Sequence, residues 1–417
     1  MTTKYLIIGG GTATARAVEG IRELDSGGSI TVVSAEHHLP YDRPPLSKGV
    51  LLGADDPTTA LPHDAAWYRT QQVELRLGDP VASIDPDART ATLISGEQLE
   101  WERLLLATGS SVRHLDVPGA DLPGVFSLRT LDDSLALLDR LREGGRVAII
   151  GAGWIGLEVA AAARKHGCSV VVVEPQPVPL LGVMGEQIGS WFAELHRAHG
   201  VDFRFGAGVA SIDGTKAVSG LTLTDGTRLR AGTVVVGVGI RPNTMLAEAA
   251  GLTVDNGIVT DEALRASRPD IWAAGDVANW QNRTLGRQVR VEHWANAYDG
   301  GLAAGRSMAG ARVVYDPQPF FYSDQYDAGL EYTGYVPRGT ETEVVLRGDP
   351  SSGAFLAFWV VPEGEGVRVL AGMHVNTWDT IDPILGLIRS ADAIDRARLA
   401  DPEIPLGEVV QETRVIR

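Results

Sequence analysis

The stretch RVAIIGAGWIGLEVAAAARKHGCSVVVVE, residues 146–174, decides the fold. Its aliphatic run at 147–150 predicts a strand, and the apolar and small residues after Gly156 predict a helix. A second run at 170–173 predicts another strand, which ends at Glu174. A Gly-x-Gly-x-x-Gly motif between strand and helix, with an acidic residue about 20 positions further on, is typical of a dinucleotide-binding β-α-β unit. All these parts occur here in order, which favours dinucleotide binding over an accidental glycine-rich turn.

Each glycine of the motif has a predicted task. Gly151 makes the tight turn, Gly153 lets a pyrophosphate approach the backbone, and Gly156 lets the helix pack closely on the strand. The positive end of the helix dipole then faces the phosphates.

The N-terminal stretch KYLIIGGGTATARAVEGIRELDSGGSITVVSAE repeats this pattern. It predicts a strand at 5–8, a helix at about 12–24 and a strand at 30–33. Gly9 and Gly11 stand at the turn and the pyrophosphate, and Glu36 follows the second strand. Thr14 stands where the third small residue is expected, so we expect this helix to lie slightly away from the strand.

Composition is that of a globular protein with two or three domains, at 417 residues, 44% apolar and 22% charged. The net charge of −16 argues against nucleic acid as a general partner. We expect a cytoplasmic enzyme without a membrane span, because the apolar run after Lys4 is too short for a signal peptide. The one cysteine, Cys168, can build neither a disulfide framework nor a cysteine-rich metal site, and we expect it in the core and no metal.

The loop PYDRPPLSKGVLLG is stiffened by its prolines. Pro40, Pro44 and Pro45 each fix φ, and we expect them to block a helix until after Leu46. Lys48 is then either a solvated side chain or a group that a rigid arm delivers to a defined place, and the residues alone leave both open.

Two buried strands are expected to end beside a bound cofactor. The first, at 104–106, ends in Ala107-Thr108-Gly109, whose small residues allow close approach. The second, at 271–273, ends in Gly275-Asp276. The Asp276 carboxylate could accept a hydrogen bond from a hydroxyl of a ribityl chain or a ribose, or it could cap a helix. The two roles are compatible.

Other elements follow from periodicity. Helices are predicted at 67–71, 131–141 and 186–199, strands at 73–77, within 81–101 and at 233–238, and a turn at Asp225-Gly226. From about Pro319 short β-rich runs precede a helical stretch at 383–400, which indicates a separate α+β domain of roughly 100 residues.

Two fingerprints suggest two dinucleotides, one of which must hold electrons. A nicotinamide cofactor beside a flavin is the economical pair. Flavoenzymes that reduce disulfides need two nearby cysteines, which this chain lacks. Electrons are therefore expected to leave the flavin directly, for a protein carrier, a quinone or oxygen.

The motifs PYDRPPLSK, LLLATGS, IIGAGWIGLEVA, GVGIRPN, GLTVDNGIVTDE, IWAAGDVAN, VEHWANA and FFYSDQYDAGLEYTGYV carry a resemblance that covers essentially the whole chain. In this order they resemble the FAD-dependent NADH:ferredoxin reductase family, of the putidaredoxin reductase and aromatic-ring dioxygenase reductase type, which is related to apoptosis-inducing factor. The resemblance implies an α/β fold with two Rossmann-like dinucleotide-binding domains, like the pyridine nucleotide-disulfide reductases, and a C-terminal α+β domain. The expected domains are FAD-binding at 1–112 and 239–318, NADH-binding at 113–238, and C-terminal at 319–417.

The resemblance also implies the two cofactor sites. For FAD it implies Gly9, Gly11, Thr12, Ala13, Glu36, Arg43, Lys48, Val81, Thr108, Gly109, Arg129, Asp276, Val277, Glu292, Trp294 and Tyr322. For NADH it implies Gly151, Gly153, Ile155, Gly156, Glu158, Glu174 and Gly239.

Lys48 and Glu158 are the implied catalytic pair, because in the family the corresponding lysine lies near flavin N5 and pairs with the glutamate. Glu158 as a first-turn carboxylate that complements the helix dipole is compatible with this role. The expected chemistry is hydride transfer from NADH to flavin N5, which needs positioning rather than a general base, followed by single-electron transfer.

Glu174 predicts a preference for NADH over NADPH. The next residues, Pro175, Gln176 and Pro177, offer no cation for a 2′-phosphate. A carboxylate–phosphate contact costs on the order of 1–4 kcal/mol, or about one to three decades of preference.

The chain departs from the family's pattern at Tyr322, where dioxygenase-type reductases carry a tryptophan, and we assign Tyr322 no electron-transfer role. His293 is expected to be structural. An acidic reductase needs a local positive patch to meet an acidic ferredoxin, for which Arg283, Arg287 and Arg290 are candidates, or else they form a solvated loop.

The expected partner is an iron–sulfur ferredoxin that serves a P450 or an oxygenase, and the chain is expected to be a monomer or homodimer. An NADH oxidase or quinone reductase, and a redox-sensing interaction protein resembling apoptosis-inducing factor, stay open as alternatives, because function depends on the partner surface.

Overall fold

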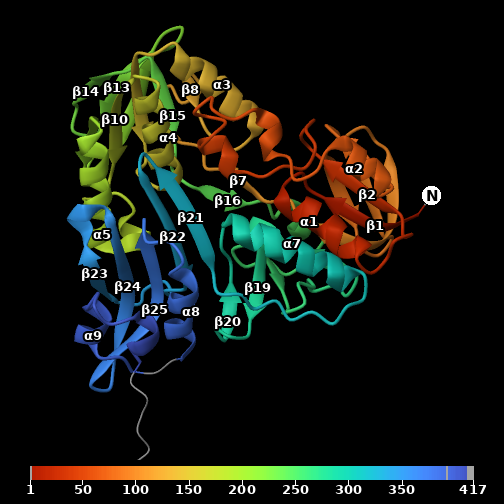
Figure 1. The fold of residues 1–417 in the computed structure, drawn as a ribbon. Coiled ribbons are helices and arrows are strands. Elements are labelled where there is room, and N and C mark those ends of the chain that lie inside the picture. Colours follow the sequence, from red (N-terminus) through yellow and green to blue (C-terminus); the bar gives the residue numbers. More distant parts are fainter. Residues whose placement is uncertain (1, 391–392, 411–417) are drawn as a thin grey trace, which may run out of the picture. The chain divides into compact units, whose positions relative to one another are not determined.

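The computed structural model describes residues 2–390 and 393–410 (Figure 1). They group into two compact units. The first unit holds the chain up to Asp116 with Phe126–Glu143 and Val236–Pro317, and the second holds Val117–Val125, Gly144–Val235 and the chain from Gln318 onward. The α/β fold class is confirmed, while the expected division into three domains stays a prediction.

The first unit is built on a sheet in the order β3-β2-β1-β6-β5-β4, with β18 also paired to β6. The strands of this sheet are β1 Thr3–Ile8, β2 Ile30–Ser34, β3 Val73–Leu77, β4 Val81–Asp85, β5 Thr90–Leu93, β6 Gln98–Leu106 and β18 Ile271–Ala273. Two smaller sheets of the same unit consist of β7 Ser110–Val112 with β16 Ile240–Pro242, and of β17 Ile258–Thr260, β19 Ala278–Asn282 and β20 Arg287–Val289. Strands β2, β1, β6 and β18 run parallel, which places their carboxyl ends at one edge. Near these carboxyl ends the strands are buried aliphatic runs, such as Leu104 to Leu106 of β6, as expected for parallel strands that are covered on both faces.

The helices of the first unit are α1 Thr12–Arg22, α2 Ala65–Thr70, α3 Leu131–Arg142, α6 Met245–Ala249 and α7 Trp294–Met308, with short 3-10 helices η1 Pro44–Ser47, η2 Pro57–Ala60 and η3 Gly275–Val277. Helices α1 and α7 pack side by side (Figure 1). Gly301 and Gly305 of α7 allow this, since a Cβ there would lie 2.4 Å from Ala13 O and 2.2 Å from Ala17 O.

The second unit contains the nucleotide-binding sheet predicted from residues 146–174, in the order β11-β10-β9-β15-β8. Its elements are β8 Val125–Phe126, β9 Arg146–Ile150, α4 Trp154–Lys165, β10 Ser169–Glu174, α5 Leu181–Ala198, β11 Val201–Phe205 and β15 Thr233–Val236, beside a small sheet of β12 Val209–Gly214, β13 Val218–Leu223 and β14 Arg228–Arg230. Strands β9, β10 and β11 are parallel. The predicted turn at Asp225-Gly226 joins β13 and β14, with Gly226 at φ +84°.

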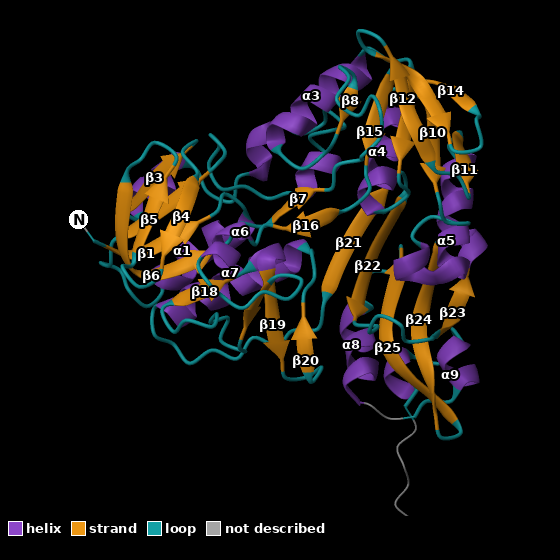
Figure 2. Ribbon diagram, turned by 180° about the vertical axis from the view of Figure 1, so that it is seen from behind, coloured by secondary structure: helices purple, strands orange, loops and turns teal. Residues whose placement is uncertain are grey.

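The C-terminal part of the second unit is the expected α+β domain. Its antiparallel sheet has the order β21-β22-β25-β24-β23 (Figure 2). The elements are β21 Phe320–Gln325, β22 Ala328–Gly334, β23 Glu343–Asp349, η4 Pro350–Ser352, β24 Ala354–Glu363, β25 Gly366–Val375, α8 Ile381–Ser390, α9 Arg396–Ala400 and η5 Leu406–Glu408. Helix α8 packs against β25 through Ile384 and Leu387, which are buried with strand residues such as Phe358.

Several local predictions are wrong. The prolines do not delay a helix until after Leu46, because η1 spans Pro44–Ser47. Proline is tolerated in a first turn, where its missing N–H would have no partner. The buried strand predicted at 104–106 is confirmed as the end of the longer β6, whereas β15 ends at Val236 rather than at residue 238. The stretch 383–400 holds parts of two helices, and residues 391–392 within it lie outside the described residues.

The helix pair α1–α7 gives a stability prediction. Gly305→Ala should lower the free energy of unfolding by about 1–3 kcal/mol, because the new methyl meets Ala17 O. Gly386→Ala is the matched control, since Gly386 lies exposed in α8 with no described atom within 4 Å of its Cβ position. It should raise stability by up to about 1 kcal/mol. Urea unfolding of both variants checks this, and two changes of the same sign would contradict the packing argument.

Candidate active site

The N-terminal glycine loop joins β1 to α1 and leaves room for a ligand at one glycine only. A Cβ on Gly9, which has φ +153°, would lie 2.2 Å from Ala107 O, and one on Gly10 would lie 2.3 Å from Ser34 Oγ. At Gly11, the N-cap of α1, no described atom lies within 4 Å of the Cβ position. Since glycine has no side chain to cap the first-turn N–H groups, this loop fits a pyrophosphate.

The second glycine loop has the same construction. A Cβ on Gly156 would lie 2.1 Å from Gly151 O, whereas around Gly153, the N-cap of α4, the described residues leave 4 Å of space. The carboxylate of Glu174, the last residue of β10, accepts the N–H of Ala152 at 2.7 Å. Glu174 therefore ties the glycine loop to the end of β10. Ile155, in the first turn of α4, is exposed. These residues fit a dinucleotide bound through its phosphates.

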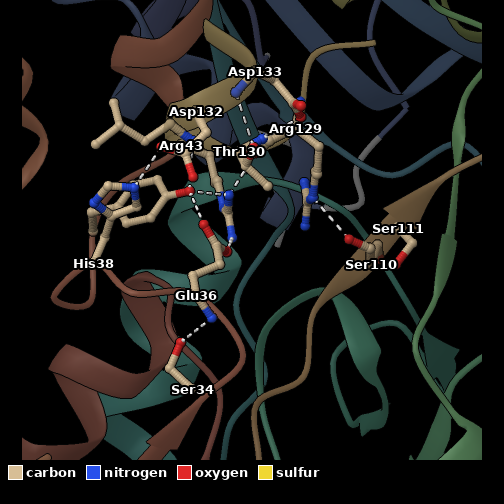
Figure 3. A network of polar contacts seen from close by, with 12 residues as sticks. Ser34, Glu36, His38, Arg43, Ser110, Ser111, Arg129, Thr130, Asp132 and Asp133 are labelled. Atoms are coloured by element: carbon tan, nitrogen blue, oxygen red, sulfur yellow. Dashed lines mark hydrogen bonds and ion pairs between the residues drawn. The ribbon is translucent and has the colours of Figure 1, made fainter. Parts of the chain in front are cut away.

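A charged cluster follows β2 and includes two predicted FAD residues. Figure 3 shows the Glu36 and Arg43 side chains pointing toward one another, and Arg43 Nη2 lies 2.7 Å from Glu36 Oε1. Tyr41, which the sequence did not single out, donates to Glu36 Oε2 at 2.6 Å and accepts the N–H of Leu131 at 2.9 Å. Burial raises the pKa of the Tyr41 phenol, so it stays a donor. The cluster therefore ties the end of β2 to the start of α3.

Arg129 extends this cluster to the second strand end. The Arg129 carbonyl accepts a hydrogen bond from Arg43 Nη1 at 2.6 Å, and Arg129 Nε donates to Ser110 O at 2.8 Å. Its Nη2 lies 2.7 Å from the Asp276 carboxylate. The prediction that Asp276 caps a helix is wrong, because the N-cap of η3 is Ala274. An ion pair to Arg129 across 147 residues of chain holds this carboxylate instead.

Asn243 is a second residue that sequence reasoning missed. Its Nδ2 donates to Thr108 O at 2.8 Å, and Thr108 Oγ1 donates to Asn243 O at 2.8 Å. The Asn243 N–H also reaches Gly109 O at 2.9 Å. This reciprocal clamp fixes the end of β6, and its only sequence signal was the motif GVGIRPN.

The two residues of the implied catalytic pair lie in different units. Lys48 follows η1 in the first unit and is half-buried. Glu158 lies on α4 in the second unit, is 6% exposed, and accepts the Ser323 hydroxyl at 2.6 Å. The interpretation of Glu158 as a first-turn carboxylate is wrong, because α4 begins at Trp154. The role of the pair stays a prediction.

The remaining site residues are distributed over both units. In the first unit Val81 begins β4, Val277 is buried in η3, and Glu292 and Trp294 flank the N-cap of α7, His293. Gly239, predicted for NADH, belongs to this unit with φ +96°, and its carbonyl accepts the Arg113 N–H. Tyr322, predicted for FAD, lies on β21 of the second unit. Their roles stay predictions.

The arginine patch has little net positive charge. Arg283 pairs with Glu262, and Arg290 lies 2.7 Å from Glu292. Arg287 is exposed on β20. Two of the three candidate arginines are thus neutralised by neighbours, which weakens their case as a docking patch.

The described residues contain neither a candidate metal site nor a candidate membrane span. In residues 2–390 and 393–410, no group of three or more His, Cys, Asp or Glu side chains could hold a metal ion. Over the same ranges, none of the helices has the length and apolar character that crossing a membrane requires.

The chain matches two known protein families over nearly its whole length. The family described as pyridine nucleotide-disulphide oxidoreductase matches residues 3–301, and the family described as reductase C-terminal matches residues 320–410. The chain therefore belongs to the pyridine nucleotide-disulphide oxidoreductase family. Within it the chain groups with the ferredoxin–NAD(+) reductases, which confirms the resemblance carried by the motifs.

Relatives are similar over nearly their full length. The chain is 39% identical to the anthranilate 1,2-dioxygenase system ferredoxin–NAD(+) reductase component of Burkholderia cepacia, covering 96% of this chain and 98% of that one. It is 32% identical to putidaredoxin reductase of Pseudomonas putida, covering 97% and 96%. The structure of the covalent putidaredoxin reductase–putidaredoxin complex matches with a TM-score of 0.92 at 32% identity, over 98% of both chains.

The N-terminal glycine loop gives a binding prediction. Gly11→Ala should fold normally, because its methyl meets no described atom, but that methyl occupies the space left for the pyrophosphate. A penalty of about 1–3 kcal/mol corresponds to about a 5- to 150-fold loss of FAD affinity. Gly9→Ala should instead lower the stability of the apoprotein, because of its φ and of Ala107 O. FAD titration and urea unfolding of both variants test this. Wild-type FAD affinity in Gly11→Ala would rule out the placement.

Burial of His196 gives a pH prediction. This side chain is 0% exposed, and burial lowers its pKa from 6.5 to about 4. The unfolded chain therefore binds this proton at a higher pH than the folded chain does. The contribution of neutral His196 to the free energy of unfolding is therefore intact above pH 6.5. It is lost as the pH falls toward 4, and the loss is at most about 3 kcal/mol.

Urea unfolding between pH 7 and pH 4 measures this slope. His196→Gln should show a shallower loss of stability than the wild type. His114→Gln, at an exposed histidine, should keep the wild-type slope. Equal slopes in all three proteins would show that His196 is not held neutral.

Proposed function

We propose that the protein is an FAD-containing, NADH-dependent ferredoxin reductase. The observation that carries this proposal is the combination of two glycine loops, each opening a β-α-β unit, with a single buried cysteine. Two dinucleotides can be held, and an internal dithiol cannot form. The route through a redox-active cysteine pair is thus closed to this chain, and electrons leave the flavin for an external acceptor.

FAD, when bound, accepts a hydride from NADH and gives its electrons up one at a time. The chain's residues position the reactants. Gly11 and the first turn of α1 would hold the FAD pyrophosphate, and Asp276, itself held by Arg129, would meet the ribityl chain. Gly153 and Glu174 would hold the pyrophosphate and adenosine ribose of NADH. No side-chain base is needed, so alignment supplies much of the rate.

Lys48 and Glu158 are assigned the electrostatics of the reacting ring. Lys48 would stabilise negative charge that develops on the flavin when hydride arrives, and Glu158 would orient that ammonium group. The stiff loop of η1 supports the first role, since it leaves Lys48 half-buried at a defined place. The assignment rests on the resemblance of these motifs to the family.

The acceptor proposed for this chain is an iron–sulfur ferredoxin. The relative in Burkholderia cepacia is named as a ferredoxin–NAD(+) reductase component of a dioxygenase system, and putidaredoxin reductase has been solved in a covalent complex with putidaredoxin. By analogy the ferredoxin would serve a P450 or an oxygenase in the cytoplasm, with the reductase a monomer or homodimer.

One experiment tests the function and the choice of nucleotide. The purified protein should be yellow, and NADH should bleach it without oxygen, with an efficiency about 10- to 1,000-fold above that of NADPH because of the Glu174 carboxylate. Cytochrome c reduction should depend on added ferredoxin. Equal use of NADPH would show that Glu174 is misplaced. Rapid turnover with oxygen or a quinone alone would indicate an oxidase or quinone reductase, and a long-lived reduced complex with little turnover would indicate a redox sensor.

A further inference from the structure

Strand β21 packs against α4 and α5 with a matching spacing of side chains. Alternate residues of a strand share a face, and residues four apart share a face of a helix. The Phe321 ring lies 5.1 Å from that of Trp154 on α4, which in turn lies 5.4 Å from Phe192 on α5. Two positions further along β21 and four along each helix, polar residues replace this apolar layer.

The polar layer is a continuous chain of hydrogen bonds that begins at Glu158. Ser323 Oγ donates to Glu158 Oε1 at 2.6 Å, and Gln325 Nε2 donates to Ser323 Oγ at 3.1 Å. Gln325 Oε1 lies 2.8 Å from His196 Nε2, and His196 Nδ1 lies 3.1 Å from the Tyr326 hydroxyl. These hydrogen bonds thus connect the helix of the NADH-binding fingerprint to the C-terminal sheet within the second unit.

The direction of each hydrogen bond follows from the single proton of the Ser323 hydroxyl. Because this proton goes to Glu158 Oε1, Ser323 Oγ must accept from an amide N–H of Gln325. The amide oxygen of Gln325 then faces His196, which must carry its proton on Nε2. His196 Nδ1 is left to accept from the Tyr326 hydroxyl. Each group therefore has one orientation that satisfies its neighbours.

Burial makes this order important. Glu158 is 6% exposed, Ser323 1%, Gln325 2% and His196 0%. A buried carboxylate is stable as an ion only when it is hydrogen-bonded, and the low dielectric around it strengthens each bond. The Tyr326 ring stacks on His199 with centroids 3.7 Å apart, which fixes the far end of the chain.

We propose that Ser323, Gln325 and His196 are positioning residues that hold the Glu158 carboxylate in the orientation required for hydride transfer. This inference rests on the proposed function, because that function gives Glu158 its place at the reacting ring. The amide of Gln325 does not pass protons readily, so this series of hydrogen bonds orients Glu158 and does not conduct protons to it. Strand β21 thereby contributes to nicotinamide chemistry, although it lies outside both glycine loops.

A double-mutant cycle tests the proposal on the FAD-loaded protein. Ser323→Ala removes the donor, Glu158→Leu removes the acceptor, and flavin bleaching by NADH is followed anaerobically by stopped flow. Ser323→Ala should lower the limiting rate of bleaching about tenfold, with the Kd of NADH unchanged within twofold. In the Glu158→Leu background the same substitution should change the rate less than twofold. Gln325→Leu breaks the same series of hydrogen bonds at a second residue. It should also lower the limiting rate in the wild-type background and change it less than twofold in the Glu158→Leu background.

Thr333→Val is the matched control, because it removes another buried hydroxyl from the neighbouring strand β22. It should leave the limiting rate unchanged. Ser323→Thr keeps a hydroxyl and should recover most of the rate lost in Ser323→Ala.

The outcomes separate this inference from the proposed function. If NADH bleaches the wild type but Ser323→Ala and Gln325→Leu keep its rate, the positioning role is wrong and the reductase function stands. Equal rate losses in both Glu158 backgrounds would also overturn it, since they would show general damage. If NADH fails to bleach the FAD-loaded wild type, the proposed function fails and the positioning role fails with it. A urea cycle on the same four proteins should still show non-additive midpoints, because it reports the Ser323–Glu158 bond alone.

Discussion

Close approach of one backbone to another at glycine is the constraint on which both nucleotide-binding units depend. Gly9 meets Ala107 O across the parallel sheet, and Gly156 meets Gly151 O within its own loop. A side chain at Gly9 would push the loop away from the end of β6, and one at Gly156 would push α4 away from the loop that follows β9. The glycines left open, Gly11 and Gly153, lie where the helix N-terminus presents unpaired donors to a ligand. Each loop thus combines tightly packed glycines with one open glycine, and together they shape a phosphate site.

The first unit achieves this packing differently from the second. Thr14 replaces the third glycine of the motif, and its side chain is fully buried in α1. Close backbone approach to α1 also comes from α7, where a Cβ on Gly301 or Gly305 would meet the carbonyl of Ala13 or Ala17. Helix α1 is therefore held by a helix from a distant part of the sequence.

The sequence predicts well what is encoded locally. Both β-α-β units, the C-terminal α+β domain and the turn at Asp225-Gly226 follow from periodicity and glycine placement within short segments. The error at Pro44 was also local, because a rule for helix interiors was applied to a first turn. The polar connections could not be predicted this way. Arg129 and Asp276 are 147 residues apart, and Glu158 and Ser323 are 165 apart, so no spacing rule joins them.

These long connections share one physical role. A cofactor site needs charged groups in fixed orientations, yet a half-buried Asp276 or a buried Glu158 would be costly without a partner. In each case the partner comes from a different segment of the same unit, Arg129 in one and Ser323 in the other. The residues that give a site its chemistry are therefore recognisable from motifs, whereas the residues that hold them in place become visible only when the chain is folded. For that reason Tyr41, Asn243 and His196 carry structural weight that their positions in the sequence did not indicate.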